Sequence, residues 1–157
     1  MIHGRSLAAL LRDCEGAMAI ETALIAPVLL LLSLGGFQIS SLVARQTELQ
    51  TAMAEAEAVA LATDPDNSQK LTTIQQIVMA STNLPSGNVV VTNAFRCNDN
   101  TTYQDAITSC ATGDKVSSYV KVEITDSYAP LWSKFGLKGT IQLDQIRYIM
   151  FKQATKS

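Results

Sequence analysis

The sequence predicts an α+β protein, with a long N-terminal membrane-spanning helix followed by a second helix and a small antiparallel sheet. Apolar residues concentrate near the N-terminus, where Ala23 to Ala44 form 22 consecutive uncharged residues. Farther along, apolar residues recur at helical spacing. Toward the C-terminus, apolar and polar residues alternate, as they do in β-strands. The chain therefore divides into a leader at 1–16, a transmembrane and extended helix at 17–63, and an exported α+β domain at 64–157.

Composition and charge exclude several function classes. The net charge is −2, and the 12 Lys and Arg residues are scattered singly, whereas a nucleic-acid-binding surface needs a basic patch. There is no phosphate-binding loop, nucleophile motif or metal-ligand cluster in the sequence. The only histidine, His3, lies in the leader. We therefore expect a protein that is not an enzyme, holds no cofactor or metal and binds no nucleic acid.

The apolar run is long enough to cross a bilayer. A helix spans a hydrocarbon core of roughly 30 Å with about 20 apolar residues, whereas a cleavable secretory signal has an apolar region of about 7–15. Pro27 lies within the run, where we expect it to kink the helix. Arg5 and Arg12 precede the segment and Arg45 follows it. This narrow bias places the N-terminus in the cytoplasm.

One carboxylate interrupts the apolar run. Glu21 is the only charged residue between Gly16 and Ala44, and it follows Gly16 by five positions. An ionisable group within a membrane span is costly, by about 2.5–3.5 kcal/mol at mid-bilayer, so it is a functional-site hypothesis. The alternative is that Glu21 lies near the membrane interface and is solvated.

The stretch Gly16-Ala17-Met18-Ala19-Ile20-Glu21-Thr22-Ala23-Leu24-Ile25-Ala26-Pro27 resembles a prepilin signal, in which a leader ends in Gly and Glu is the fifth mature residue. It looks most like the start of TadE-like proteins, the minor pseudopilins of the tight-adherence (Flp) pilus system. Gly35 and Gly36 match the family's downstream glycine, and residues 45–52 resemble its juxtamembrane helix. Beyond that, the chain follows the family only in outline.

The resemblance implies a minor pseudopilin or pilus assembly protein that a prepilin peptidase cuts after Gly16, making Ala17 the first mature residue. Glu21 would then neutralise the terminal amine of a neighbouring subunit. The implied partners are this peptidase, other pilins and pseudopilins, an inner-membrane assembly platform and the lipid bilayer. The implied location is the bacterial inner membrane, crossed once, with the C-terminal domain in the periplasm or incorporated into a surface pilus.

Two features depart from the pattern of pilins, and two alternatives remain open. Ala17 stands where pilins often carry Phe or Met, and the leader contains Asp13 and Glu15. TadF-like proteins share the same N-terminal pattern, so the subtype is not assigned.

One alternative function is an uncleaved, signal-anchored periplasmic binding module. Another is a secreted domain that is cut beyond the apolar run.

The exported region begins with helices. Helical spacing places apolar residues on one face after Arg45 (Leu49, Ala52, Met53, Ala56, Val59, Ala60 and Thr63). The Asp64-Pro65-Asp66-Asn67 segment ends this helix, and a second helix is predicted over 68–81 from Leu71, Ile74, Ile77 and Val78. A turn at 83–88 follows.

Strands are predicted at 89–95, 119–128 and 140–151. In the second strand, Val120, Val122 and Ile124 share one face, which indicates a half-buried antiparallel strand. In the last, Ile146, Tyr148 and Met150 continue the apolar face after a phase slip at 144–145, which predicts a bulge there. Trp132 and Phe135, in the loop between these strands, are expected to cover the end of the sheet. A role in a protein interface is the alternative, because aromatic residues are enriched at interface hot spots.

Cys97 and Cys110 bracket a polar loop, with twelve residues between them. A disulfide is the favoured interpretation, because cysteines beyond the membrane span would lie in an oxidising compartment. Two free thiols or a metal site are the alternatives. Zinc would need further ligands at recognisable spacing.

Overall fold

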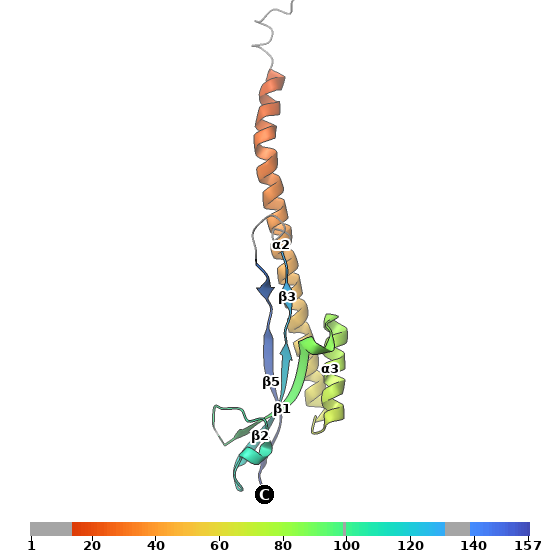
Figure 1. Ribbon diagram of the computed structural model, residues 1–157, viewed down its shortest axis with the longest axis vertical. Coiled ribbons are helices and arrows are strands. Elements are labelled where there is room, and N and C mark those ends of the chain that lie inside the picture. Colours follow the sequence, from red (N-terminus) through yellow and green to blue (C-terminus); the bar gives the residue numbers. More distant parts are fainter. Residues whose placement is uncertain (1–13, 99, 131–138) are drawn as a thin grey trace, which may run out of the picture. The chain divides into compact units, whose positions relative to one another are not determined.

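The computed structural model describes residues 14–98, 100–130 and 139–157, with side chains described from Met18 onward. In chain order the elements are α2 (Cys14–Thr63), α3 (Ser68–Thr82), the 3-10 turn η1 (Ser86–Asn88), β1 (Val89–Cys97), the 3-10 turn η2 (Ile107–Ser109), β2 (Lys115–Ile124), β3 (Ser127–Tyr128), β4 (Ile141–Gln142) and β5 (Gln145–Thr155) (Figure 1). This confirms the predicted α+β class. The chain divides into two compact units, Met1–Ser41 and Leu42–Ser157.

In the first unit, every described residue belongs to helix α2, and its large apolar side chains are exposed. Leu30, Leu31 and Leu32 are 65 %, 70 % and 68 % exposed. The hydroxyl groups of Thr22 and Ser33 each donate to the carbonyl oxygen four residues earlier, both at 2.8 Å. Their polar atoms are therefore satisfied without water, as a hydrocarbon environment requires. Pro27 lies inside the helix, and the kink expected there stays a prediction.

The second unit has a core between two helices and a three-stranded antiparallel sheet of order β1-β2-β5. The predicted face of β2 is fully buried at Val120, Val122 and Ile124. The helices contribute Leu49, Ala52, Met53, Ala56, Ala60, Ile74 and Val78 to the same cluster. The apolar helix faces are thus confirmed, apart from Thr63, which is exposed.

Local signals set the ends of the helices as predicted. Helix α2 stops at Thr63, and Asp64 takes a left-handed conformation with φ of 48°. Asn67 then caps α3, because its side-chain oxygen accepts a hydrogen bond from the backbone N–H of Lys70 at 3.0 Å. At the other end Asn83 is left-handed, with φ of 54°. Asn tolerates this conformation better than most residues, which explains its place at the C-cap.

The single C-terminal strand predicted over 140–151 is wrong, because two strands occupy this region. β4 pairs with β3 in a separate two-stranded ribbon, whereas β5 pairs with β2. Leu143, between β4 and β5, is buried and does not continue the strand alternation of Ile141. Its backbone N–H donates to the carbonyl oxygen of Asp126 at 2.8 Å. The irregularity within the main sheet lies opposite Ser118/Tyr119 and not at 144–145.

The predicted inward face of this last strand is also wrong. Ile146, Tyr148 and Met150 are 56 %, 37 % and 50 % exposed, whereas Ile149 is buried opposite Val120. The strand is interrupted after Leu143. The alternation of inward and outward side chains before this break therefore does not predict which residues of β5 face inward. The sequence contains enough apolar residues for either phase, and pairing with β2 selects between them.

Candidate functional site

Glu21 lies on an exposed stretch of helix α2 among apolar neighbours. Met18 and Leu24 are each 71 % exposed, and Ile25 is 46 % exposed. Glu21 itself is exposed, and within the part of the chain that the structure describes its carboxylate has no hydrogen bond or ion pair. The site is therefore a single carboxylate on an apolar helix surface. It has the chemistry to bind one cationic group from another molecule.

This helix is long enough and apolar enough to cross a membrane, and no part of its apolar stretch is buried within the protein. Residues 16–57 match the family model of TadE-like proteins. This segment is TadE-like. The match begins at Gly16 and includes Glu21 and Pro27, the residues that carried the resemblance in the sequence.

The TadE-like segment contains residues of both units. Its first part is the exposed apolar helix, which is consistent with a single-pass membrane protein. Its last part supplies the buried helix face of the second unit, from Leu49 to Ala56. No curated protein and no solved structure matches the chain. The match of this segment suggests a protein associated with the tight-adherence pilus.

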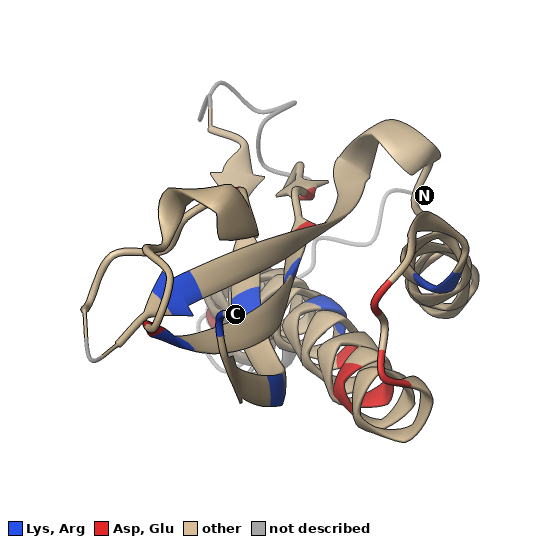
Figure 2. Ribbon diagram, turned by 90° about the horizontal axis from the view of Figure 1, so that it is seen from below, with Lys and Arg blue, Asp and Glu red and all other residues tan. Residues whose placement is uncertain are grey.

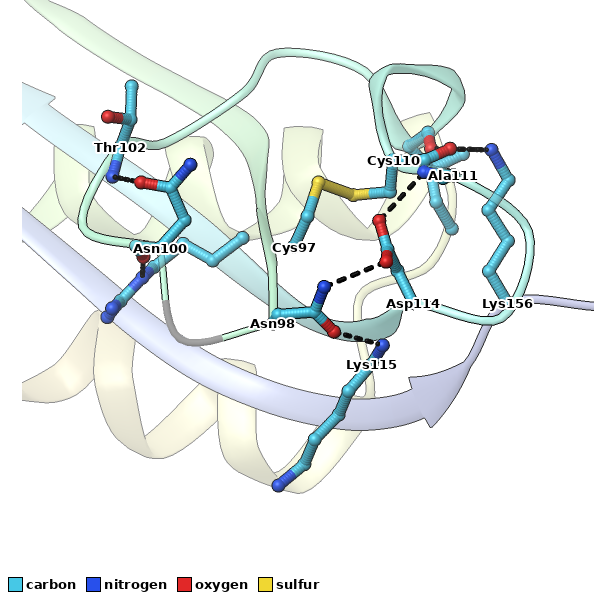
Figure 3. The surroundings of a disulfide bond; sticks show 11 residues. Cys97, Asn98, Asn100, Thr102, Cys110, Ala111, Asp114, Lys115 and Lys156 are labelled. Carbon is cyan, nitrogen blue, oxygen red and sulfur yellow. Dashed lines mark hydrogen bonds between the residues drawn. A yellow bond between two sulfur atoms is a disulfide. The ribbon is translucent and has the colours of Figure 1, made fainter.

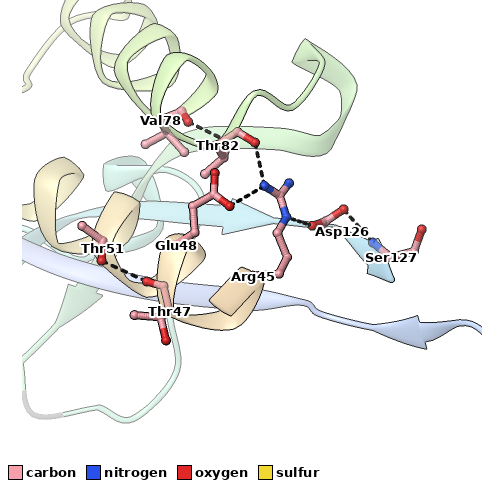
Figure 4. A network of polar contacts seen from close by, with 8 residues as sticks. All are labelled: Arg45, Thr47, Glu48, Thr51, Val78, Thr82, Asp126 and Ser127. Atoms are coloured by element: carbon pink, nitrogen blue, oxygen red, sulfur yellow. Dashed lines mark hydrogen bonds and ion pairs between the residues drawn. The ribbon is translucent and has the colours of Figure 1, made fainter. Parts of the chain in front are cut away.

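Arg45, also in the TadE-like segment, is the centre of a polar network (Figure 4). Its Nε donates to Oδ2 of Asp126 at 2.7 Å, and its Nη1 donates to Oε2 of Glu48 at 2.9 Å and to the carbonyl oxygen of Thr82 at 3.0 Å. Burial alone would lower the pKa of Arg45, but hydrogen bonds to Asp126 and Glu48 outweigh it and raise the pKa. One guanidinium thus joins α2 to the end of α3 and to the segment after β2.

This role of Arg45 was not predicted from the sequence. There it served only as a charge that flanks the membrane span, because its main partner, Asp126, lies 81 positions away. The sequence signal is a single arginine at the start of the amphipathic part of the helix. Nothing in the local pattern points to Asp126.

The predicted disulfide is present between Cys97 and Cys110, with their Cα atoms 5.4 Å apart (Figure 3). Hydrogen bonds close the base of the loop between them. The Asn98 amide donates from Nδ2 to Oδ1 of Asp114 at 2.7 Å, and its Oδ1 accepts from the backbone N–H of Lys115 at 2.9 Å. The loop is therefore tied to the start of β2 independently of the disulfide.

The same loop reaches the outer face of the sheet. The ring of Tyr103 stacks on Tyr148 with centroids 3.8 Å apart, and meets Tyr119 edge-on at 5.2 Å. The guanidinium of Arg96 lies 5.6 Å from the centre of the Tyr103 ring. These contacts cover part of the face opposite the helices and hold the disulfide loop against it.

For the other predicted site residues, the structure describes either the backbone alone or nothing. Gly16 and Ala17 lie within helix α2. The leader residues before Cys14, with His3, Arg5 and Arg12, lie outside the described residues, as do Trp132 and Phe135. Among the residues that the structure describes, no three His, Cys, Asp or Glu side chains form a group that could hold a metal ion.

Proposed function

We propose that the chain is a minor pseudopilin or pilus assembly protein of a tight-adherence pilus, processed after Gly16 by a prepilin peptidase. The observation that carries this proposal is the family match, which begins at Gly16 and contains Glu21 on an exposed, membrane-length helix. The exported domain is then a structural and interaction module, and the protein is not an enzyme.

Processing and assembly use the same few residues. Cleavage after Gly16 leaves an α-amine on Ala17, one helical turn before Glu21. A carboxylate in hydrocarbon requires a partner, and the terminal amine of a neighbouring subunit supplies it. The exposed leucines around the segment contact lipid before assembly and other apolar helices after it.

The protein is proposed to cross the inner membrane once, with its N-terminus in the cytoplasm and the C-terminal domain in the periplasm. The Lys/Arg bias of the flanks supports this orientation. The Cys97–Cys110 disulfide supports it too, because disulfides persist in the periplasm and not in the cytoplasm. The proposed partners are the prepilin peptidase, other pilins and pseudopilins, the assembly platform and the lipid bilayer.

Intact mass of the membrane-extracted protein tests the processing step. A host with its prepilin peptidase should yield a chain that begins at Ala17, and a host without it should yield the precursor. Gly16→Val should block processing. The matched control is Gly35→Val in the same helix, where a Cβ atom would meet nothing within 4 Å, and it should leave processing intact. An intact leader in both hosts would instead favour the signal-anchored binding module.

The role of Glu21 is tested separately from processing. Glu21→Ala should be cut normally and then fail to support pilus assembly, because the neighbour's amine loses its partner. The control is Thr22→Val at the adjacent position, whose hydroxyl bonds only its own helix, and it should assemble normally. Normal piliation with Glu21→Ala would refute the pairing mechanism while leaving the processing result untouched.

A further inference from the structure

A cavity of about 390 Å³ lies on the helix side of the sheet, near the disulfide end. Helix α2 ends at Thr63, and the link to α3, with Asp66, borders the cavity. Beyond this link the strands continue past the end of α3 (Figure 1). The apolar lining comes from Phe95, Ile107, Val116, Phe151 and Ala154.

Asn93 gives this apolar cavity an unpartnered polar group. It lines the cavity from β1, opposite Val120 on β2. Its Oδ1 atom is buried, and within the described part of the chain no donor reaches it. A buried carbonyl oxygen without a donor is destabilising, so such an atom in a native protein calls for a physical explanation. A backbone N–H from a bound segment would satisfy it.

The charged groups around the cavity are mainly basic. Lys152 and Lys156 line it, and neither forms an ion pair with a carboxylate among the residues that the structure describes. Nζ of Lys156 already donates to the carbonyl oxygens of Ile107 and Cys110, so Lys152 is the cation left for a ligand. The one acidic lining residue, Asp66, already pairs with Lys70 at 3.0 Å. Viewed from this end, basic residues lie on the strands around the C-terminus, whereas acidic residues mark α2 and the segment after it (Figure 2). The cavity thus favours an anion in a chain whose net charge is −2.

The strand beside the cavity has an open edge. β5 is the last strand of the sheet and pairs only with β2 in the described structure. Phe151, Lys152 and Ala154 of this strand line the cavity. An edge strand offers unpaired N–H and C=O groups to an extended peptide, and a neighbouring cavity then selects its side chains.

We propose that this cavity binds an extended segment of a partner protein, with an apolar side chain between Phe95 and Phe151 and an adjacent carboxylate at Lys152. The backbone of the segment runs across the cavity from the open edge of β5 to Asn93 on β1, where one of its N–H groups donates to Oδ1. The apolar lining, the ammonium group of Lys152 and the open edge each specify a different part of this ligand. The inference is independent of the proposed pilus function.

Site-specific photo-crosslinking in the intact chain, expressed in its host, tests the proposal. A benzophenone amino acid replaces Ala154, which lines the cavity, or Thr92 as the control, which is exposed on the opposite face of the sheet. Mass spectrometry then sequences the adduct. We expect an adduct at 154 and not at 92, on a peptide with an apolar residue within two positions of Asp, Glu or a C-terminal carboxylate.

Charge variants decide whether Lys152 recognises that carboxylate. Lys152→Glu should lower the yield of the adduct by roughly tenfold or more, and Lys152→Gln should lower it less. Lys115→Glu, exposed but not lining the cavity, should not change it. Retention of the Cys97–Cys110 disulfide on a non-reducing gel checks folding. An absent adduct, a lipid adduct, a peptide without a carboxylate, or indifference to Lys152→Glu would overturn the proposal.

Discussion

The Nε atom of Arg45 donates to Oδ2 of Asp126 at 2.7 Å and so joins helix α2 to the segment between β2 and β3. The other carboxylate oxygen of Asp126 accepts the backbone N–H of Ser127 at 2.8 Å. Their side chains are only 24 % and 13 % exposed. Removing either partner would leave a partly buried charge without its main counterion.

Arg45→Met should therefore destabilise the second unit by about 2 kcal/mol, because Asp126 loses a charge-assisted hydrogen bond in a partly buried site. Hydrogen exchange of the β2 amides in the full chain measures this loss. The control is Lys70→Met, which breaks the more exposed pair with Asp66 and should cost less. Equal effects of the two substitutions would show that the Arg45 network contributes nothing beyond a surface ion pair.

Leu49→Ala should destabilise the same unit by about 2–5 kcal/mol, since Leu49 is fully buried and truncation leaves a cavity in the core. Leu61→Ala makes the same chemical change on the same helix, where the side chain is 58 % exposed. Its effect should stay below about 1 kcal/mol. Denaturant unfolding of the two variants side by side separates burial from helix propensity, which is identical for both changes.

Replacing Cys97 and Cys110 together with Ser should lower the free energy of unfolding by about 3 kcal/mol, because the bond closes a loop of this length in the unfolded chain. The hydrogen bonds of Asn98 remain and should preserve the start of β2. Ala111→Ser, an exposed change beside Cys110, serves as the control and should leave the stability of the second unit unchanged. A double variant as stable as the parent would contradict the expectation.

The Asp66–Lys70 pair predicts a pH dependence. A hydrogen bond from Nζ of Lys70 to Oδ1 of Asp66 holds the pKa of Asp66 below its ordinary value of 3.8. Because the folded-state pKa is the lower one, the stabilisation is complete above that ordinary value and is lost as the pH falls through the folded-state value. An NMR titration should show the pKa of Asp66 rising toward 3.8 in Lys70→Gln. A pKa that does not move would refute this cause.

The helices, the disulfide and the buried face of β2 followed from the sequence because each rests on local signals. The 64–67 segment ends one helix and caps the next, and Asn67 and Asn83 have side chains suited to those positions. Alternation at Val120, Val122 and Ile124 correctly indicated the buried face. The TadE-like segment was also recognisable from its own residues, since Gly16, Glu21 and the apolar run are adjacent in the chain.

The C-terminal strands could not be predicted in the same way. Ile146, Tyr148 and Met150 alternate as a core face would, yet they are exposed, because pairing with β2 turns Ile149 inward. Tyr148 instead stacks on Tyr103 from the disulfide loop. A period of two specifies that a strand has two faces, and only the partner strand and the covering helices decide which face is buried.

The sequence by itself determined the membrane-length helix, the position of Glu21 within it, the order of most later elements and the cysteine pair. These properties depend on residues that are close together in the chain or on composition alone. The tertiary structure decided the partners of Arg45, the exposed face of β5 and the cavity beside Asn93 and Lys152. Each of these depends on contacts between distant segments, such as the 81 positions that separate Arg45 from Asp126, and local periodicity carries no information about such contacts.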